Sequence, residues 1–222
     1  MPETDSIKTS VGELKTTFIG HGTLMFEVGD TVIHVDPWTN LADYRALPKA
    51  DIVLVTHEHR DHLDPAAIAA VRKEGTVTLL PEKCAAQVPG STVLRNGDVR
   101  TVKGLKIEAV PAYNIAHKRP SGEPFHPRGE GNGYVITFGD TRVYVAGDTE
   151  NIPEMKHLKD IAIAFLPVNL PYTMTPEMAA DAARMFSPKV LYPYHFGDTD
   201  IAELVKLLAP EKSIEVRIRS MK

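Results

Sequence analysis

Apolar and polar residues in the first part of the chain fall into short runs with the period of β-strands. Such runs predict strands over Leu14–Ile19, Thr23–Val28 and Thr31–Val35, and the pair Gly29-Asp30 between the last two is typical of a hairpin turn. A fourth run, Asp51–Thr56, is mostly apolar and leads directly into a histidine-rich stretch. The first part of the chain is therefore predicted to be a sheet.

A helix is predicted after the histidine-rich stretch. Asp64 suits the N-cap and Pro65 suits the first helical position, and the pattern extends to about Lys73. The same order of elements returns about 110 residues later. The matched pairs are Gly29–Val35 with Gly139–Val145, Asp51–Leu54 with Asp160–Ile163, Asp64-Pro65 with Thr175-Pro176, and Thr78–Pro81 with Val190–Pro193. Units of strand, turn and strand can resemble one another by chance, but four matches in one order at nearly constant spacing favour a duplication.

Two β-rich halves, each with helices, imply two sheets packed face to face with helices outside, a four-layer αββα sandwich of the α/β (α+β) class. We expect a single domain over residues 1–222. Binding sites in such folds lie where strands end in loops, at the seam between the halves. The loops after Thr56 and Val145 both follow apolar strands of the repeat, so they are expected to meet at that seam.

The composition narrows the class of protein. A formal charge of −4 gives no electrostatic footprint for nucleic acid. The single cysteine, Cys84, excludes an internal disulfide framework and fits a reducing compartment. Residues 1–10 do not resemble a signal peptide, and the longest apolar run, Ile161–Val168, is too short to span a bilayer. We expect a cytoplasmic protein with no nucleic-acid partner and no membrane span. Homo-oligomerisation stays open.

The stretch from His57 to His62 holds three histidines and an aspartate within six residues. His57 and His59 alternate on an extended backbone, so their side chains could hold one ion. Asp61 and His62 come where the chain turns toward the helix, and they could serve a second ion. A histidine-rich surface loop is the alternative, but imidazoles this crowded repel one another when protonated and gain only from a cation. The pattern therefore predicts a metal site.

This stretch resembles the HxHxDH signature of the metallo-β-lactamase superfamily. Further motifs of the family match Asp36 in Val35-Asp36-Pro37, Asp148 in Gly147-Asp148-Thr149, and His195 in Pro193-Tyr194-His195-Phe196. Gly20-His21-Gly22-Thr23 resembles the GHA[ST] opening of the branch that contains ascorbate-6-phosphate lactonase and N-acyl-phosphatidylethanolamine phospholipase D. The resemblance covers nearly the whole chain, and the αββα sandwich of that family agrees with the repeat.

The resemblance implies the site. The implied metal ligands are His57, His59, Asp61, His62, Asp148 and His195. Asp148 would bridge two ions, and Asp36 and His21 would hold the ligands in orientation. One or two divalent ions are expected, with zinc favoured and manganese, iron or nickel as alternatives, because imidazole and carboxylate ligands suit all four.

One position departs from the family pattern. The family supplies a third histidine to the first metal from a strand end, and here the corresponding strand, Leu105–Val110, leads to Asn114. An amide oxygen is a weak ligand for zinc compared with imidazole. His117 and His126 follow in a stretch rich in glycine and proline. We therefore expect either a weakened first site or one completed by a histidine of this loop.

The implied activity is that of a metal-dependent hydrolase, in which a metal-bound hydroxide cleaves a small ester, lactone or phosphodiester. Asp61 would be the catalytic residue that ligates the metal and orients the hydroxide. Arg119 and Arg128 make the loop after Asn114 basic, so it is either a lid that contacts an anionic substrate or a solvated loop tip. The other class of function is a non-catalytic metal-binding protein derived from a hydrolase with a weakened first site.

Overall fold

The first half of the chain forms one mixed sheet. The structure is a computed structural model that describes residues 2–222. Its first seven strands lie side by side in chain order. They are β1 (Glu3–Thr9), β2 (Gly12–Gly20), β3 (Thr23–Val28), β4 (Thr31–Val35), β5 (Ala50–Leu54), β6 (Arg72–Leu80) and β7 (Thr92–Val93). β1 to β4 pair antiparallel, and β5, β6 and β7 join in parallel.

The second half repeats this arrangement. Its strands are β8 (Val99–Val102), β9 (Leu105–Ala112), β10 (Gly131–Phe138), β11 (Thr141–Val145), β12 (Ile161–Pro167), β13 (Val190–Tyr194) and β14 (Glu215–Val216). They also lie in chain order, with β8 to β11 antiparallel and β12 to β14 added in parallel. Because strand order and direction agree throughout, the duplication predicted from the sequence is confirmed at the level of topology.

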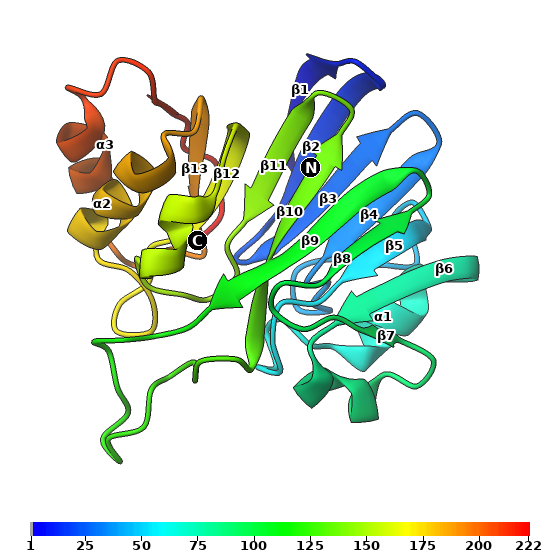
Figure 1. The fold of residues 1–222 in the computed structure, drawn as a ribbon. Helices are drawn as coiled ribbons and strands as arrows, with labels where there is room; N and C mark the ends of the chain where they lie inside the picture. The colour runs from blue at the N-terminus through cyan, green and yellow to red at the C-terminus, as the bar shows by residue number, and fades with distance from the viewer. Residues whose placement is uncertain (1) are drawn as a thin grey trace.

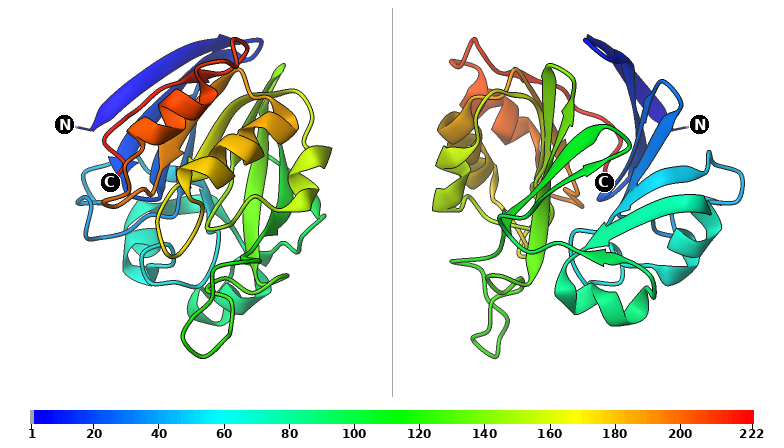
Figure 2. Two further views of the ribbon diagram at one scale, coloured as in Figure 1. Left: turned by 90° about the vertical axis from the view of Figure 1, so that its left-hand side faces the viewer. Right: turned by 45° about the vertical axis from the view of Figure 1, so that its right-hand side comes forward.

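Helices lie on the outer faces of the two sheets (Figures 1 and 2). They are α1 (Pro65–Val71), α2 (Pro176–Phe186), α3 (Ala202–Leu208) and the short 3₁₀ helices η1 (Glu82–Gln87) and η2 (Pro153–His157). Between the sheets, aromatic side chains of both halves pack on one another, as in the pairs Phe26–Phe138 and Phe18–Tyr192. The predicted four-layer αββα sandwich is therefore confirmed, and its core lies between the sheets. No helix within residues 2–222 is long and apolar enough to cross a membrane.

Local sequence signals account for most boundaries. The Asp64 carboxylate accepts hydrogen bonds from the backbone N–H groups of Ala66 and Ala67, which caps α1 as expected. The helix ends at Val71 rather than near Lys73, because Arg72 is extended and begins β6. β1 was not predicted. It is a polar edge strand whose residues are all exposed or half-buried, so it carries no apolar pattern.

The end of the chain is tied to this edge strand by a cluster of polar side chains. The Arg219 guanidinium donates to both oxygens of Asp5, with Nη2 at 2.8 and 2.6 Å, and stacks over the ring of Phe18. The Tyr192 hydroxyl donates to the same carboxylate. Partial burial would raise the pKa of Asp5, but the hydrogen bonds from Arg219 and Tyr192 lower it below its ordinary value.

Replacing Asp5 with asparagine is expected to lower the free energy of unfolding at pH 7 by about 1–2 kcal/mol, the range of a charge-assisted hydrogen bond. A lowered pKa in the folded state means that the stabilisation is present above the ordinary aspartate pKa and is lost as pH falls through the folded value. Urea unfolding of both proteins should therefore show a difference at pH 7 that shrinks toward pH 3. Asp43→Asn removes only an exposed pair with Arg45 and should cost little at either pH. A pH-independent difference for Asp5→Asn would contradict the assignment.

Candidate metal centre

The loops that follow β5 and β11 meet at the seam between the sheets. The backbone N–H of Asn132 donates to the carbonyl of Thr56 at 2.8 Å, which joins the two halves beside the histidine-rich stretch. Gly147 lies in the left-handed region with φ of +67°, and a Cβ there would come within 2.9 Å of the Asn132 carbonyl oxygen. Only glycine therefore permits this close approach, which brings Asp148 up to His57.

Three non-glycine residues at the site also adopt left-handed backbone conformations. They are His21, Asp36 and His195, with φ of +51°, +46° and +48°. Each lies at a strand end: His21 between β2 and β3, Asp36 after β4, and His195 after β13. Such conformations cost free energy and persist where the surrounding structure constrains them, which is common at functional sites.

A first cluster of candidate ligands consists of His57, His59, His126 and Asp148, whose ligand atoms all lie within 4.8 Å of one another. His59 Nδ1 is 3.1 Å from His57 Nε2 and 3.2 Å from His126 Nε2. Asp148 Oδ2 is 3.2 Å from His126 Nε2 and 3.8 Å from His57 Nε2. Ligands placed tetrahedrally about 2.1 Å from one zinc ion lie about 3.4 Å apart, so this spacing fits a bound ion.

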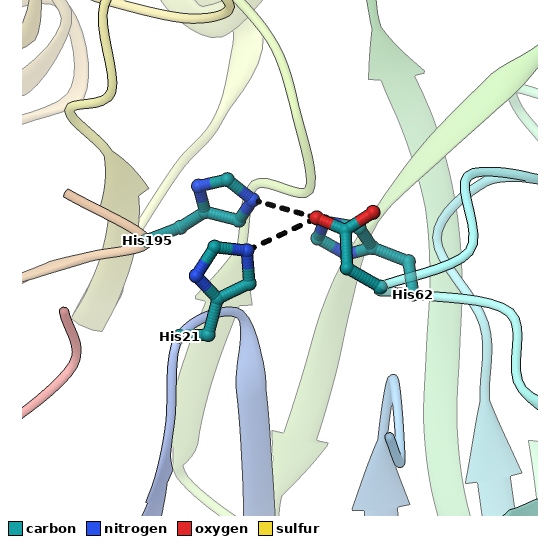
Figure 3. A group of neighbouring side chains, drawn as sticks. His21, His62 and His195 are labelled. Atoms are coloured by element: carbon teal, nitrogen blue, oxygen red, sulfur yellow. Dashed lines mark hydrogen bonds and ion pairs between the residues drawn. The ribbon is translucent and has the colours of Figure 1, made fainter. Parts of the chain in front are cut away.

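A second cluster lies next to the first and consists of His21, Asp61, His62 and His195. The rings of His21, His62 and His195 lie close together in Figure 3. Asp61 Oδ2 is 3.0 Å from His21 Nε2 and 3.5 Å from both His62 Nε2 and His195 Nε2. Asp148 also reaches this cluster, with Oδ1 3.6 Å from His62 Nε2. The Asp148 carboxylate therefore contacts both clusters.

Buried atoms without partners support a cation at the second cluster. Buried polar atoms are normally hydrogen-bonded. Among the described residues, His62 Nε2, His195 Nε2 and Asp148 Oδ1 are buried and have no hydrogen-bond partner. All three face the same space beside Asp61. Two imidazole nitrogens and a carboxylate oxygen are ordinary ligands of zinc, manganese and iron, so the donor set fits a divalent ion.

Asp36 fixes the orientation of the His62 ring through its Nδ1 atom. Its buried carboxylate accepts from the backbone N–H and the hydroxyl of Thr56, at 2.7 and 2.6 Å, and lies 2.7 Å from His62 Nδ1. With Nδ1 engaged in this way, Nε2 is the nitrogen that points at the second cluster. Burial would lower the pKa of His62, but the carboxylates of Asp148 and Asp36 raise it to about 10. This site therefore strongly favours positive charge.

The structure separates the loop residues that the sequence left undecided. His126 completes the first cluster, which favours completion from the loop over a weakened site. His117 lies outside both clusters, with Nδ1 2.9 Å from Glu150 Oε1. Asn114 does not face an ion position and instead contacts His126. Arg128 pairs with Glu154 at 2.7 Å and does not line the cavity above the clusters.

A cavity of about 480 Å³ opens above both clusters. Its lining includes Arg60, Arg119, Phe125, Asn169 and Tyr172 besides most of the candidate ligands, with His57 and His62 outside the lining. The Arg119 guanidinium lies over the Phe125 ring at 5.2 Å, and its Nη2 is 3.2 Å from His59 Nε2. The cavity therefore presents positive charge and an aromatic wall above the metal-ligating groups.

Two contacts were missed from the sequence. Asn169 Nδ2 lies 3.1 Å from His195 Nδ1, and the buried carboxylate of Glu150 contacts the loop that carries His126. Glu150 directly follows Gly147-Asp148-Thr149, but nothing in its local pattern signals this role. His21 was expected only to orient ligands, whereas the structure places its Nε2 among the possible donor atoms of the second cluster.

Two facing sheets with a histidine- and aspartate-rich site at their shared edge define the metallo-β-lactamase fold. Residues 15–195 match the model of the family described as Beta-lactamase superfamily domain. The chain is 33% identical to a UPF0173 metal-dependent hydrolase of Pelotomaculum thermopropionicum, a similarity that covers 93% of this chain and 97% of that protein. The chain belongs to the metallo-β-lactamase superfamily and, within it, to the UPF0173 metal-dependent hydrolases.

Solved structures agree with this assignment. The crystal structure of a candidate metal-dependent hydrolase from Parabacteroides distasonis is 55% identical and superposes with a TM-score of 0.95 over 100% of both chains. Igni18, a metallo hydrolase of the archaeon Ignicoccus hospitalis, is 26% identical with a TM-score of 0.76, over 92% of this chain and 94% of that one. The predicted family is therefore confirmed.

Proposed function

We propose that this protein uses a pair of divalent metal ions, zinc in the first instance, to hydrolyse a small anionic ester, lactone or phosphodiester. The observation that carries the proposal is the pair of adjacent ligand clusters that share Asp148 and open into one cavity. Two such sites side by side can act on the attacking and the leaving oxygen of one substrate.

Each ion would have its own ligands. His57, His59 and His126 would hold the first ion, and Asp61, His62 and His195 would hold the second, with Asp148 between them. When bound, the ions would lower the pKa of a water molecule toward ~7 and polarise the scissile carbonyl or phosphoryl group. Residues of both clusters line the cavity, among them His126 of the first and Asp61 of the second, so a substrate and a water molecule can reach both clusters together.

Asp61 is the proposed catalytic residue. Its side chain lines the cavity, and its Oδ2 lies among the nitrogens of His21, His62 and His195. Burial would raise the pKa of Asp61, but the neighbouring imidazoles of His195 and His21 hold it well below the ordinary value. The carboxylate is therefore kept ionised, the form in which it would ligate the second ion and orient the attacking water.

The rival function, a non-catalytic metal-binding protein, depended on a weakened first site. His126 argues against this rival function, because it gives the first cluster a third imidazole although Asn114 stands where the family has a histidine. Metal analysis of the purified protein, followed by turnover of a panel of simple lactones, carboxylic esters and phosphodiesters, tests the proposal. Two ions per chain with turnover of at least one substrate class would support it. Two ions with no turnover of any class would favour the rival function.

Arg119 supports an anionic substrate, because its guanidinium lines the cavity beside His59. Replacing Arg119 with alanine is expected to raise KM for an anionic substrate about tenfold, the loss of roughly 1.5 kcal/mol for one charge-assisted hydrogen bond. Arg128→Ala is the matched control from the same loop, because Arg128 pairs with Glu154 outside the cavity. Steady-state kinetics at matched metal content measures both. Equal KM values for the Arg119 variant and the parent would show that Arg119 does not bind the substrate.

A further inference from the structure

Asn114 and His126 form a closed pair of hydrogen bonds beside the first cluster. The buried Asn114 side chain accepts through Oδ1 from the backbone N–H of His126 at 2.9 Å and lies 2.6 Å from its ring Nδ1. The backbone N–H of Asn114 donates in return to the His126 carbonyl at 2.9 Å. His126 is thus held by Asn114 at its backbone and at its ring.

The contacts of the amide fix which atom is which. Asn114 Nδ2 faces two groups that only accept, Glu150 Oε1 at 3.1 Å and the carbonyl of Tyr172 at 2.9 Å. Oδ1 must therefore be the atom that faces His126. An amide oxygen cannot donate, so His126 Nδ1 carries the proton. The lone pair of His126 is then on Nε2, the atom that lies in the first cluster.

Glu150 holds the start of the same loop. Its fully buried carboxylate accepts from three successive backbone N–H groups, those of Ile115, Ala116 and His117, at 2.7, 2.7 and 2.6 Å. It also accepts from the Asn114 amide. A carboxylate offers only acceptors, and this one is used by donors on both oxygens. The contact ties the loop to the strand end that carries Asp148.

We infer that Asn114 and Glu150 are positioning residues that deliver His126 to the first metal site. The inference rests on the proposed two-ion function and adds to it the means by which a loop histidine is held. His126 lies on the long connection between β9 and β10, the green segment that extends away from the sheets in Figure 1. Ordering a loop residue costs conformational entropy. These hydrogen bonds already order His126 in the metal-free protein, so this cost does not reduce the free energy of ion binding.

The test isolates the first site. In an Asp61→Ala background, which disables the second cluster, Co²⁺ is titrated by calorimetry and by its visible absorption. Asn114→Ala should raise the dissociation constant at least tenfold, in the range of about 10–100-fold for lost outer contacts to a ligand. Glu150→Gln, which places an amide N–H₂ against these donors, should act in the same direction. Asn169→Ala is the control, because Asn169 contacts His195 of the second cluster.

Non-additivity separates positioning from a general structural effect. If Asn114 acts through His126, then Asn114→Ala should cause no further loss of Co²⁺ affinity in a His126→Ala protein. Unchanged affinity in Asn114→Ala, or an equal further loss on top of His126→Ala, would overturn the inference. Circular dichroism of the metal-free proteins checks folding, and Glu150→Gln provides a second variant. If the Asp61→Ala parent bound no Co²⁺ at all, the two-ion function itself would fail and the inference with it.

Discussion

Replacing Asp148 with alanine is expected to remove both metal ions and to lower kcat/KM by about a thousandfold or more, since metal stabilisation of the transition state amounts to several kcal/mol. The reason is geometric. Among residues 2–222, Asp148 is the one carboxylate that contacts both clusters, through His57 and His126 on one side and His62 and His195 on the other. Its removal leaves each cluster one anionic ligand short, and it leaves buried imidazoles that repel one another when charged. Metal content and kcat/KM measured on the same preparation test the prediction.

A matched control lies at the opposite end of β11, in the turn that precedes the strand. The tripeptide Gly-Asp-Thr occurs at both ends of β11, as Gly139-Asp140-Thr141 and as Gly147-Asp148-Thr149. Asp140 is exposed, and its carboxylate accepts from the backbone N–H of Ser10 and the hydroxyl of Thr141. Asp140→Ala should therefore keep both ions and full activity. Two ions retained in Asp148→Ala would show that this residue does not bridge the sites.

Much of the fold was predictable because the same order of strands, turns and helices occurs in both halves of the sequence. β3 and β4 begin and end where the alternation of apolar residues predicted, and the Asp64 cap placed the start of α1. β1 escaped prediction for a physical reason: an edge strand needs no apolar face, and its register comes from pairing with β2. Long-range pairing of this kind leaves no local signal.

The site residues also fall into those that the sequence predicts and those that it does not. His57, His59, Asp61 and His62 are close in sequence, so a short stretch predicts them together. His126 could only be named as one of two alternatives, because the choice over His117 depends on how a long loop folds back. Glu150 holds the start of this loop through its hydrogen bonds. It lies more than twenty residues after His126 in the sequence, and its role is recognisable only from those hydrogen bonds. Contacts that orient ligands come from packing, which a single sequence does not display.

Replacing Asp61 with alanine is expected to remove the second ion alone and to reduce turnover by about a thousandfold or more, on the same scale of several kcal/mol. Asp61 belongs to the cluster of His21, His62 and His195 and does not contribute to the first cluster. The first ion should therefore remain at full occupancy. Asp61→Asn keeps the size of the side chain but removes its charge, so it should bind the second ion weakly and retain little activity.

Asp64→Ala separates this effect from damage to the local fold. Asp64 lies three residues further along, and its loss removes the cap of α1, which costs about 1 kcal/mol of stability. Because it is in neither cluster, this variant should keep both ions. Metal content, kcat and urea unfolding of the three variants give the comparison. An Asp61→Ala protein with most of its turnover would exclude Asp61 as the catalytic residue, and loss of both ions would show that the two sites do not fill independently. Loss of the second ion together with turnover, at unchanged stability, is the result that the geometry requires.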